Sequence, residues 1–205
     1  RYIFYRESRL KQLDGGNFSV GNGRVIAWGR FQVRESDQSF IVVNVHLSPG
    51  SGPKAARAHG AEAARLTSAI ASINTHDDPV IISGDYNSGR HKKGDRVLGH
   101  LGRTGYSNSL HIAEKTIGAQ WNTYNWNRAR LRTSGSHIDH IFVSHGVSVN
   151  VWQQYNHLVN GRVLSDHNML SAAVVLPEEP VEVDATAKSV LLPSTTSRNM
   201  TRPLR

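Results

Sequence analysis

The chain has 205 residues, a formal net charge of +8 and no cysteine. That length suits a single domain with its own core, or one domain followed by a tail. The lack of cysteine excludes disulfides, thiolate metal sites and a cysteine nucleophile. A surplus of basic residues favours polyanionic partners such as nucleic acid, although it can equally serve solubility alone. The surplus belongs to residues 1–176, because residues 177–205 carry four acids and four bases.

The first part of the chain predicts a β-hairpin that is preceded by a short strand. Residues Ile3–Tyr5 read as a strand. Apolar and polar residues alternate over Val25–Arg34, which is the pattern of a half-buried strand. After the polar turn Glu35–Ser39, the run Phe40–Leu47 is apolar on both faces and predicts a strand in the middle of a sheet. We expect the second and third strands to pair as a hairpin.

One long helix and several strands are predicted downstream. The long helix covers Lys54–Ile73, with Pro53 near its first turn, and its core face comprises Ala63, Leu66, Ile70 and Ile73. A shorter helix is a candidate at Asp95–Leu101, among the loops expected from residue 85 to residue 122. The further strands are Val80–Ile82, Ile138–Val143, Val149–Tyr155 and Leu170–Leu176. Strands that alternate with few helices predict an α/β or α+β sandwich, in which helices cover the sheets.

The domain is predicted to end at residue 176. Residues 177–205 are rich in Pro, Ser, Thr and Arg without periodicity, so we expect a flexible tail there. No apolar run approaches the length of a membrane span, and the N-terminus shows no leader pattern. Because the chain opens directly in a predicted strand, we expect an upstream segment to be missing, and any targeting signal would lie in it. The sequence therefore indicates neither a location in the cell nor a protein partner.

Four polar clusters stand at the ends of predicted strands, where a rigid sheet can aim side chains at a ligand. In the first cluster, Asn44 and His46 are two residues apart and share one face of their strand. In the second, Asp85 and Asn87 follow a buried strand and Gly84, which permits a tight bend. A carboxylate beside an amide suits a hard cation or a phosphate-bound water. The simpler alternatives are a hydrogen-bonded core histidine in the first cluster and an Asx turn in the second.

The other two clusters combine aspartate with histidine. Asp139 begins an otherwise apolar strand, so its carboxylate must be paired, hydrogen-bonded or metal-bound, or must cap a loop. The three histidines near it have a spacing that fits no zinc pattern, which makes them surface or loop histidines. Asp166 and His167 are adjacent residues just before the last strand. On extended backbone they point in different directions, so one can bind a metal while the other faces a substrate.

The order of the four clusters is more specific than any one of them. Asn-x-His-Leu, Gly-Asp-x-Asn, Ile-Asp-x-Ile-Phe and Ser-Asp-His follow one another along the chain. This succession closely resembles the endonuclease/exonuclease/phosphatase superfamily, which includes pancreatic deoxyribonuclease, abasic-site endonucleases, sphingomyelinases and inositol-polyphosphate phosphatases. The resemblance extends from about Ile3 to Leu176. It implies a four-layered α/β sandwich, with two packed and mostly antiparallel β-sheets flanked by helices, and Mg²⁺ or Mn²⁺ as the cofactor.

The resemblance also implies a catalytic site and the role of each residue in it. His46 would contact the phosphate and stabilise its developing charge, and Asn87 would hold the attacking water or a phosphate oxygen. Asp85 would orient or deprotonate that water. Asp139 would hydrogen-bond His167, fixing its tautomer and raising its basicity, so that His167 acts on the phosphate or the water.

Metal and substrate contacts are implied in the same way. Asp166 would help to bind the divalent ion, and Asn44 and Tyr124 would join His46 and Asn87 as contacts for phosphate or substrate. The family also carries an early strand asparagine and a glutamate that is a principal metal ligand, and both are expected upstream of residue 1. We therefore expect the chain alone to bind Mg²⁺ poorly and to be nearly inactive.

Two stretches near the predicted site bear on the substrate. Basic residues follow the second cluster, namely Arg90, His91, Lys92, Lys93 and Arg96, and the run Trp121–Arg132 mixes aromatic residues with asparagine and arginine. Basic groups can track phosphates and aromatic rings can stack on bases, unless the tryptophans are core residues and the bases merely solvated. The favoured function is a metal-dependent phosphodiester hydrolase, a nuclease acting on DNA or RNA. The alternatives are a phosphatase or phosphodiesterase acting on lipid or small-molecule phosphate esters, and an inactive binding module.

Overall fold

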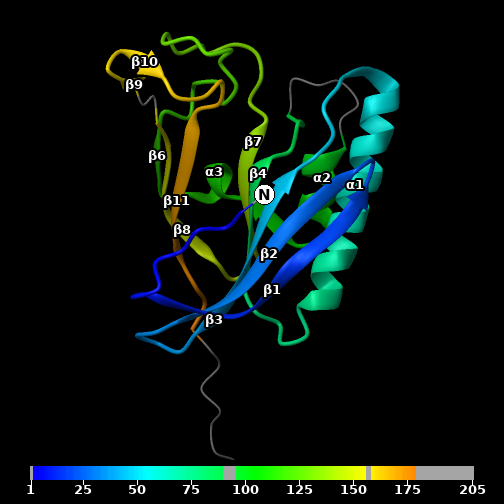
Figure 1. Ribbon diagram of the computed structural model, residues 1–205, viewed down its shortest axis with the longest axis vertical. Coiled ribbons are helices and arrows are strands. Elements are labelled where there is room, and N and C mark those ends of the chain that lie inside the picture. The colour runs from blue at the N-terminus through cyan, green and yellow to red at the C-terminus, as the bar shows by residue number, and fades with distance from the viewer. Residues whose placement is uncertain (1, 90–95, 156–157, 179–205) are drawn as a thin grey trace, which may run out of the picture.

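The computed structural model describes residues 2–89, 96–155 and 158–178, and its strands form two sheets and a small ribbon (Figure 1). The larger sheet has the order β1-β2-β3-β4-β7-β5, with β1 (Leu10–Gly21), β2 (Arg24–Val33), β3 (Ser39–His46), β4 (Val80–Asp85), β7 (Asp139–Ser144) and β5 (Tyr106–Asn108). The smaller sheet has the order β11-β8-β6, with β11 (Met169–Val175), β8 (Ser148–Tyr155) and β6 (Lys115–Ile117). The ribbon pairs β9 (Leu158–Val159) with β10 (Arg162–Val163).

The helices are α1 (Gly52–Ile73), α2 (Val97–Arg103) and the single turn α3 (Ser109–Ile112). Neighbouring strands run antiparallel except for the pairs β3–β4 and β6–β8, which are parallel. The predicted fold class, an α/β sandwich of mostly antiparallel sheets with helices against them, is confirmed. The parallel pair β3–β4 needs a crossover connection, and α1 provides it.

Two apolar cores hold these layers together. The larger core joins one face of the six-stranded sheet to α1 and α2, where Val43 and Ile82 pack with Leu66, Ile70 and Leu101. The smaller core joins the opposite face of that sheet to β8 and β11, and contains Val143, Val147 and Val149 with partly buried neighbours that include Ile81 and Val174. The helices thus cover one face of the large sheet over its central strands, whereas the other face is shared between this second core and the polar clusters.

Most predicted elements are present, with ends shifted by at most three residues. The hairpin of β2 and β3 is confirmed, and so is the long helix, in which Ala63, Leu66 and Ile70 are buried. The predicted strand at Ile3–Tyr5 is wrong, because this segment pairs with no strand. It is held by the Tyr5 ring, whose centroid lies 4.9 Å from that of Phe31, and by side-chain contacts instead of a backbone ladder.

Strand β1 was not predicted, because its centre reads Asp14-Gly15-Gly16-Asn17, a sequence typical of a turn. Its pairing with β2 along nearly its whole length overrides that preference. The flexible tail and the domain boundary before it stay predictions, since residues 179–205 lie outside the described residues. Within the described part of the chain, no helix combines the length and the apolar character needed to cross a membrane.

A buried ion pair secures the end of the large sheet opposite to the polar clusters. The Nε atom of Arg30 on β2 lies 2.6 Å from Oδ2 of Asp78, and Oδ1 of Asp78 accepts a hydrogen bond from Ser39. Burial alone would raise the pKa of Asp78, but these hydrogen bonds and the charge of Arg30 lower it below its ordinary value of 3.8. Asp78 therefore stabilises the fold when it is ionised.

We expect the substitution Asp78→Asn to lower the free energy of unfolding by about 2 kcal/mol at pH 7, because it leaves Arg30 without its charged partner. A depressed pKa contributes stability above the unfolded value of 3.8, and that contribution is lost as the pH falls through the folded value. The difference in the free energy of unfolding between the parent protein and the Asp78→Asn variant should therefore become smaller below about pH 4. Urea unfolding at pH 7 and pH 3 measures this, and a gap that is independent of pH would contradict it.

Candidate active site

The strand register brings three of the predicted site residues side by side. His46 at the end of β3 pairs with Asp85 at the end of β4, and Asp85 pairs in turn with Asp139 at the start of β7. Paired residues on adjacent strands point to the same face of a sheet, so the three side chains project together. The Nε2 atom of His46 lies 3.6 Å from Oδ2 of Asp85. The first three clusters therefore converge at one edge of the large sheet.

The chain bends sharply at Asp85, and the bend fixes this carboxylate. Oδ1 of Asp85 accepts a hydrogen bond of 2.7 Å from the backbone N–H of Asn87, which is the Asx turn considered for the second cluster. Asn87 has a φ of 48°, and its Nδ2 donates to the carbonyl of Leu47 at 3.0 Å and to Oδ2 of Asp85 at 3.2 Å. The turn is thus part of the site, because it leaves Oδ2 facing His46.

The fourth cluster reaches the same place from the far end of the chain. Nδ1 of His167 donates to Oδ2 of Asp139 at 2.8 Å, as predicted for this pair. Tyr124 forms a β-bridge with His167, and the centroids of their rings lie 5.0 Å apart. Asp139 thereby fixes the tautomer of His167 and leaves Nε2 as the ring nitrogen that can exchange a proton with a ligand.

The pKa values of Asp85 and His167 are both raised, each for a different reason. Burial raises the pKa of Asp85, and the charge of Asp139 adds to this, while the Asn87 N–H and the two histidines oppose it. The hydrogen bond to Asp139 raises the pKa of His167 against the effect of burial, and the charges of Asp139, Asp85 and Asp166 act in the same sense. Two neighbouring carboxylates and a basic imidazole therefore share one partly buried site.

This group of side chains suits a divalent metal ion. Asp85, Asp139 and His167 each offer one ligand atom, and the three atoms lie within 4.8 Å of one another. Carboxylate oxygens are the preferred ligands of Mg²⁺, and Mn²⁺ accepts imidazole as well. A cation also relieves the repulsion between the two carboxylates. The predicted ligand Asp166 does not belong to this three-residue cluster, and its role as a metal ligand stays a prediction.

Two predicted substrate contacts lie beside the cluster. Asn44 sits two residues before His46 on the same face of β3, and its Nδ2 donates to the carbonyl of Tyr2 at 3.0 Å. The Tyr124 ring contacts two other rings, because its centroid lies 5.0 Å from that of Trp126 and 5.0 Å from that of His167. Trp126 is 63% exposed, so it is not a core residue. The basic residues 90–95 fall outside the described residues, whereas Arg128, Arg130 and Arg132 are exposed.

A buried polar brace, which the sequence did not predict, joins the third and fourth clusters. Thr123 is fully buried, and its Oγ1 accepts hydrogen bonds from the N–H groups of Ile138 and Asp139 at 2.9 and 3.0 Å. Its carbonyl accepts from the N–H of Asn168 at 2.7 Å. Nδ2 of Asn125 donates to Oδ1 of Asn168 at 2.7 Å. The only signal in the sequence is the density of Asn and Thr over residues 122–127.

We expect Thr123→Val to lower the free energy of unfolding by about 2 kcal/mol, because two backbone N–H groups lose their acceptor in a buried place. Any phosphoesterase activity should fall by roughly tenfold or more, since Asp139 and His167 lose their relative position. Urea unfolding and steady-state kinetics measure the two effects. Thr123→Ser retains Oγ1 and serves as the control, and a serine variant as impaired as the valine variant would contradict the role of the hydroxyl.

Comparison with known proteins identifies the family. A model of the endonuclease/exonuclease/phosphatase family matches residues 3–167, a range that contains all four clusters. The chain belongs to this family. Its members are hydrolases, and the family generally uses divalent metals. No sequence among the curated proteins matches the chain.

Solved structures of the family share the fold. A mannosyl-6-phosphatase from Bacteroides thetaiotaomicron is 19% identical with a TM-score of 0.71, over 84% of this chain and 69% of the other. An endonuclease/exonuclease/phosphatase family protein from the same organism is 18% identical with a TM-score of 0.73, over 84% and 66%. TDP2 of D. rerio, complexed with a single-strand DNA product, is 17% identical with a TM-score of 0.57, over 83% and 70%. The chain thus spans about two thirds of the length of these proteins.

Proposed function

We propose that this protein hydrolyses phosphodiester bonds with the help of a divalent metal ion, and that its substrate is a nucleic acid. The observation that carries the proposal is the convergence of His46, Asp85, Asp139 and His167, from four separate segments, on one edge of the large sheet. A phosphodiester is anionic and repels hydroxide. Its hydrolysis therefore needs positive charge at the phosphate and a group that accepts and donates protons. This cluster offers both.

The residues divide that work according to their contacts. His46 is the most exposed member of the cluster and lies at its rim, where its ring can donate a hydrogen bond to a phosphate oxygen. Asp85, held by the Asn87 N–H and raised in pKa by burial, orients a water molecule and accepts a proton from it. His167, with its tautomer set by Asp139, exchanges a proton through Nε2 with the water or the leaving oxygen.

Asp85 and Asp139 would hold a divalent ion, which leaves Nε2 of His167 available to exchange a proton. When bound, it supplies positive charge that neutralises the phosphate oxygens. Asp166 adds negative charge near His167. The resemblance to the family implies that it is a further ligand of the divalent ion. The chemistry of the donors favours Mg²⁺ or Mn²⁺ over softer metals, since the chain contains no cysteine.

The preference for nucleic acid rests on the surroundings of His167. Tyr124 and the exposed Trp126 continue from the His167 ring as a series of aromatic faces, on which bases can stack. The exposed Arg128, Arg130 and Arg132 follow in the same loop and can contact phosphates. The net charge of +8 attracts polyanions over a longer distance.

The test compares three substrates in the presence of Mg²⁺, Mn²⁺ or EDTA: a single-stranded oligonucleotide, bis(4-nitrophenyl) phosphate and 4-nitrophenyl phosphate. We expect slow hydrolysis of the two diesters that depends on a high concentration of the metal, in keeping with the weak binding of Mg²⁺ expected of this chain, and little hydrolysis of the monoester. Activity that survives EDTA would refute the metal dependence. Hydrolysis of the monoester alone would refute the nuclease, and a lack of activity towards all three would favour a binding module.

A second candidate substrate is a small phosphate ester. The observation that favours it is a hollow of about 220 Å³ beside His167, lined also by Tyr155, Leu164 and Met169. This volume is below the usual range for sites that bind drug-sized ligands, so the hollow suits one small group such as a sugar. Filling it with Leu164→Trp should impair hydrolysis of a sugar phosphate and spare that of an oligonucleotide, if the small ester is the true substrate.

A further inference from the structure

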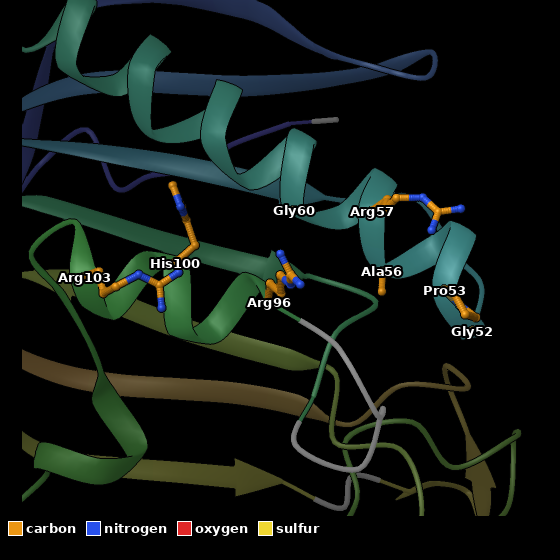
Figure 2. A pocket seen from close by; sticks show the side chains of 8 residues that line it. All are labelled: Gly52, Pro53, Ala56, Arg57, Gly60, Arg96, His100 and Arg103. Carbon is orange, nitrogen blue, oxygen red and sulfur yellow. The ribbon is translucent and has the colours of Figure 1, made fainter.

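We propose that a groove between α1 and α2 binds phosphate groups of a polynucleotide strand at a distance from the bond that is cleaved. This inference rests on the proposed function, because it adds a second contact for the same substrate. The groove has a volume of about 760 Å³. Its lining includes Arg57 from α1, Arg96 from the residue before α2, and His100 and Arg103 from α2 (Figure 2).

The groove carries positive charge that the described residues do not neutralise. The described residues that line it include no aspartate or glutamate. None of the three arginines forms an ion pair with a carboxylate in the described part of the chain. The first turn of α1 contains no acidic residue, and the side chain of Ser51 does not cap it. The N–H groups and the dipole of this long helix therefore add to the attraction that the guanidinium groups exert on an anion.

The shape of the groove follows from small residues on α1. Gly52, Ala56 and Gly60 recur every four residues and thus lie on one face of the helix, which faces the groove. A Cβ atom added at Gly60 would meet nothing within 4 Å, so the space beside it is open. Nε2 of His100 lies 2.9 Å from Oγ1 of Thr67, a contact that ties α2 to α1 and keeps the two sides of the groove in place.

The groove begins near the candidate active site. His46 ends β3 and Gly52 begins α1, so the six steps between them limit their separation to about 20 Å. Figure 1 shows the beginning of α1 at the same end of the large sheet as the tip of β3. A strand of a few nucleotides can therefore contact both places. Planar guanidinium groups that are exposed and face a groove are well suited to the oxygens of successive phosphates.

The decisive experiment adds one negative charge to the groove. Binding of a fluorescently labelled single strand of about twelve nucleotides is measured by anisotropy in EDTA, so that no hydrolysis occurs. We expect Gly60→Glu to weaken binding by about tenfold at low salt and to flatten the dependence of affinity on salt. The triple variant Arg57→Gln, Arg96→Gln, Arg103→Gln should show the same two effects. Folding is not at risk at position 60, because glutamate is a better helix former than glycine.

Two controls separate the groove from general electrostatics. Gly60→Gln has the same size without the charge and should bind nearly as the parent does. Ser68→Glu adds the same charge to the exposed surface of α1, about 12 Å further along the helix. The two glutamate variants are compared at physiological salt, where this distance exceeds the Debye length of about 8 Å. Equal losses in Gly60→Glu and Ser68→Glu, or no loss in the triple variant, would overturn the inference.

Kinetics distinguish a failure of this inference from a failure of the proposed function. Gly60→Glu should lower kcat/KM for the long strand and leave that for bis(4-nitrophenyl) phosphate unchanged, because the small diester cannot reach the groove. If the parent protein hydrolyses neither substrate but Gly60→Glu still weakens strand binding, the groove is supported and the nuclease is refuted. If hydrolysis of both substrates is normal in Gly60→Glu and strand binding is unchanged, the groove is refuted and the nuclease stands.

Discussion

Replacing His167 with glutamine is expected to lower kcat/KM for phosphodiester hydrolysis by roughly 1000-fold, while the free energy of unfolding changes by less than about 1 kcal/mol. Nδ1 of His167 is bonded to Asp139, so the ring is positioned to move a proton through Nε2. Glutamine can keep a hydrogen bond but cannot exchange a proton near neutral pH. Steady-state kinetics and urea unfolding measure the two quantities.

Asp139→Asn should produce a comparable loss, because asparagine can donate to Nδ1 and would then hold His167 in the wrong tautomer. Since the two residues act as one unit, the double variant should be scarcely slower than either single variant. A double variant in which the two losses multiply would show that Asp139 and His167 act independently. This outcome would contradict the roles proposed for them.

The control is the same substitution at the other end of β7. His145 is exposed and lies in the turn that follows this strand, at the end opposite to Asp139. His145→Gln should leave kcat/KM unchanged. Loss of activity in His145→Gln, or full activity in His167→Gln, would show that His167 and its neighbours do not catalyse the hydrolysis.

The sequence predicted the convergence of the site because each cluster stands at the end of a strand. Alternation fixes which side chains share a face of a strand, and Asn44 and His46 illustrate this on β3. Periodicity does not determine register, however, so it could not place His46 beside Asp85 or Asp85 beside Asp139. That step came from the order of the four motifs, and the strand pairing agrees with it.

The errors and omissions have physical causes that are equally specific. Ile3–Tyr5 has the composition of a strand, but its aromatic side chains lie on other rings and no neighbouring strand pairs with it. Thr123 and Asn168 are 45 residues apart and are joined by hydrogen bonds inside the protein. Polar pairs of this kind follow no period, so a single sequence carries no signal for them beyond an unusual density of Asn and Thr.

Gly84→Ala is expected to destabilise the protein by more than about 4 kcal/mol, which is enough to prevent folding in many domains of this size. Gly84 has a φ of 136°, a conformation that L side chains rarely adopt. A Cβ atom placed there would lie 2.1 Å from the carbonyl oxygen of Val45, in the backbone of the neighbouring strand β3. That oxygen cannot move away without breaking the β3–β4 ladder, so neither strand can accommodate the methyl group.

Two other glycines separate the contributions of conformation and space. Gly23 has a φ of 69° and no atom within 4 Å of an added Cβ, so Gly23→Ala should cost only about 1 kcal/mol of backbone strain. Gly60→Ala has both open space and helical backbone, and should raise stability by roughly 0.5–1 kcal/mol. Urea unfolding of the three variants measures the series. A Gly84→Ala variant that unfolds at the same urea concentration as Gly23→Ala would show that the close approach of β3 and β4 is absent.

The same close approach links stability to activity. Gly84 immediately precedes Asp85, and its lack of a side chain lets β4 pass close to β3 just before His46 and Asp85 come within 3.6 Å of each other. A Gly84→Ala protein that still folds must do so by separating the two strands, which would move Asp85 away from His46. We therefore expect any folded fraction of this variant to retain its far-ultraviolet circular dichroism and to lose phosphodiester hydrolysis by at least 100-fold. Folded Gly84→Ala protein with parental kcat/KM would mean that the spacing of these two residues does not govern catalysis.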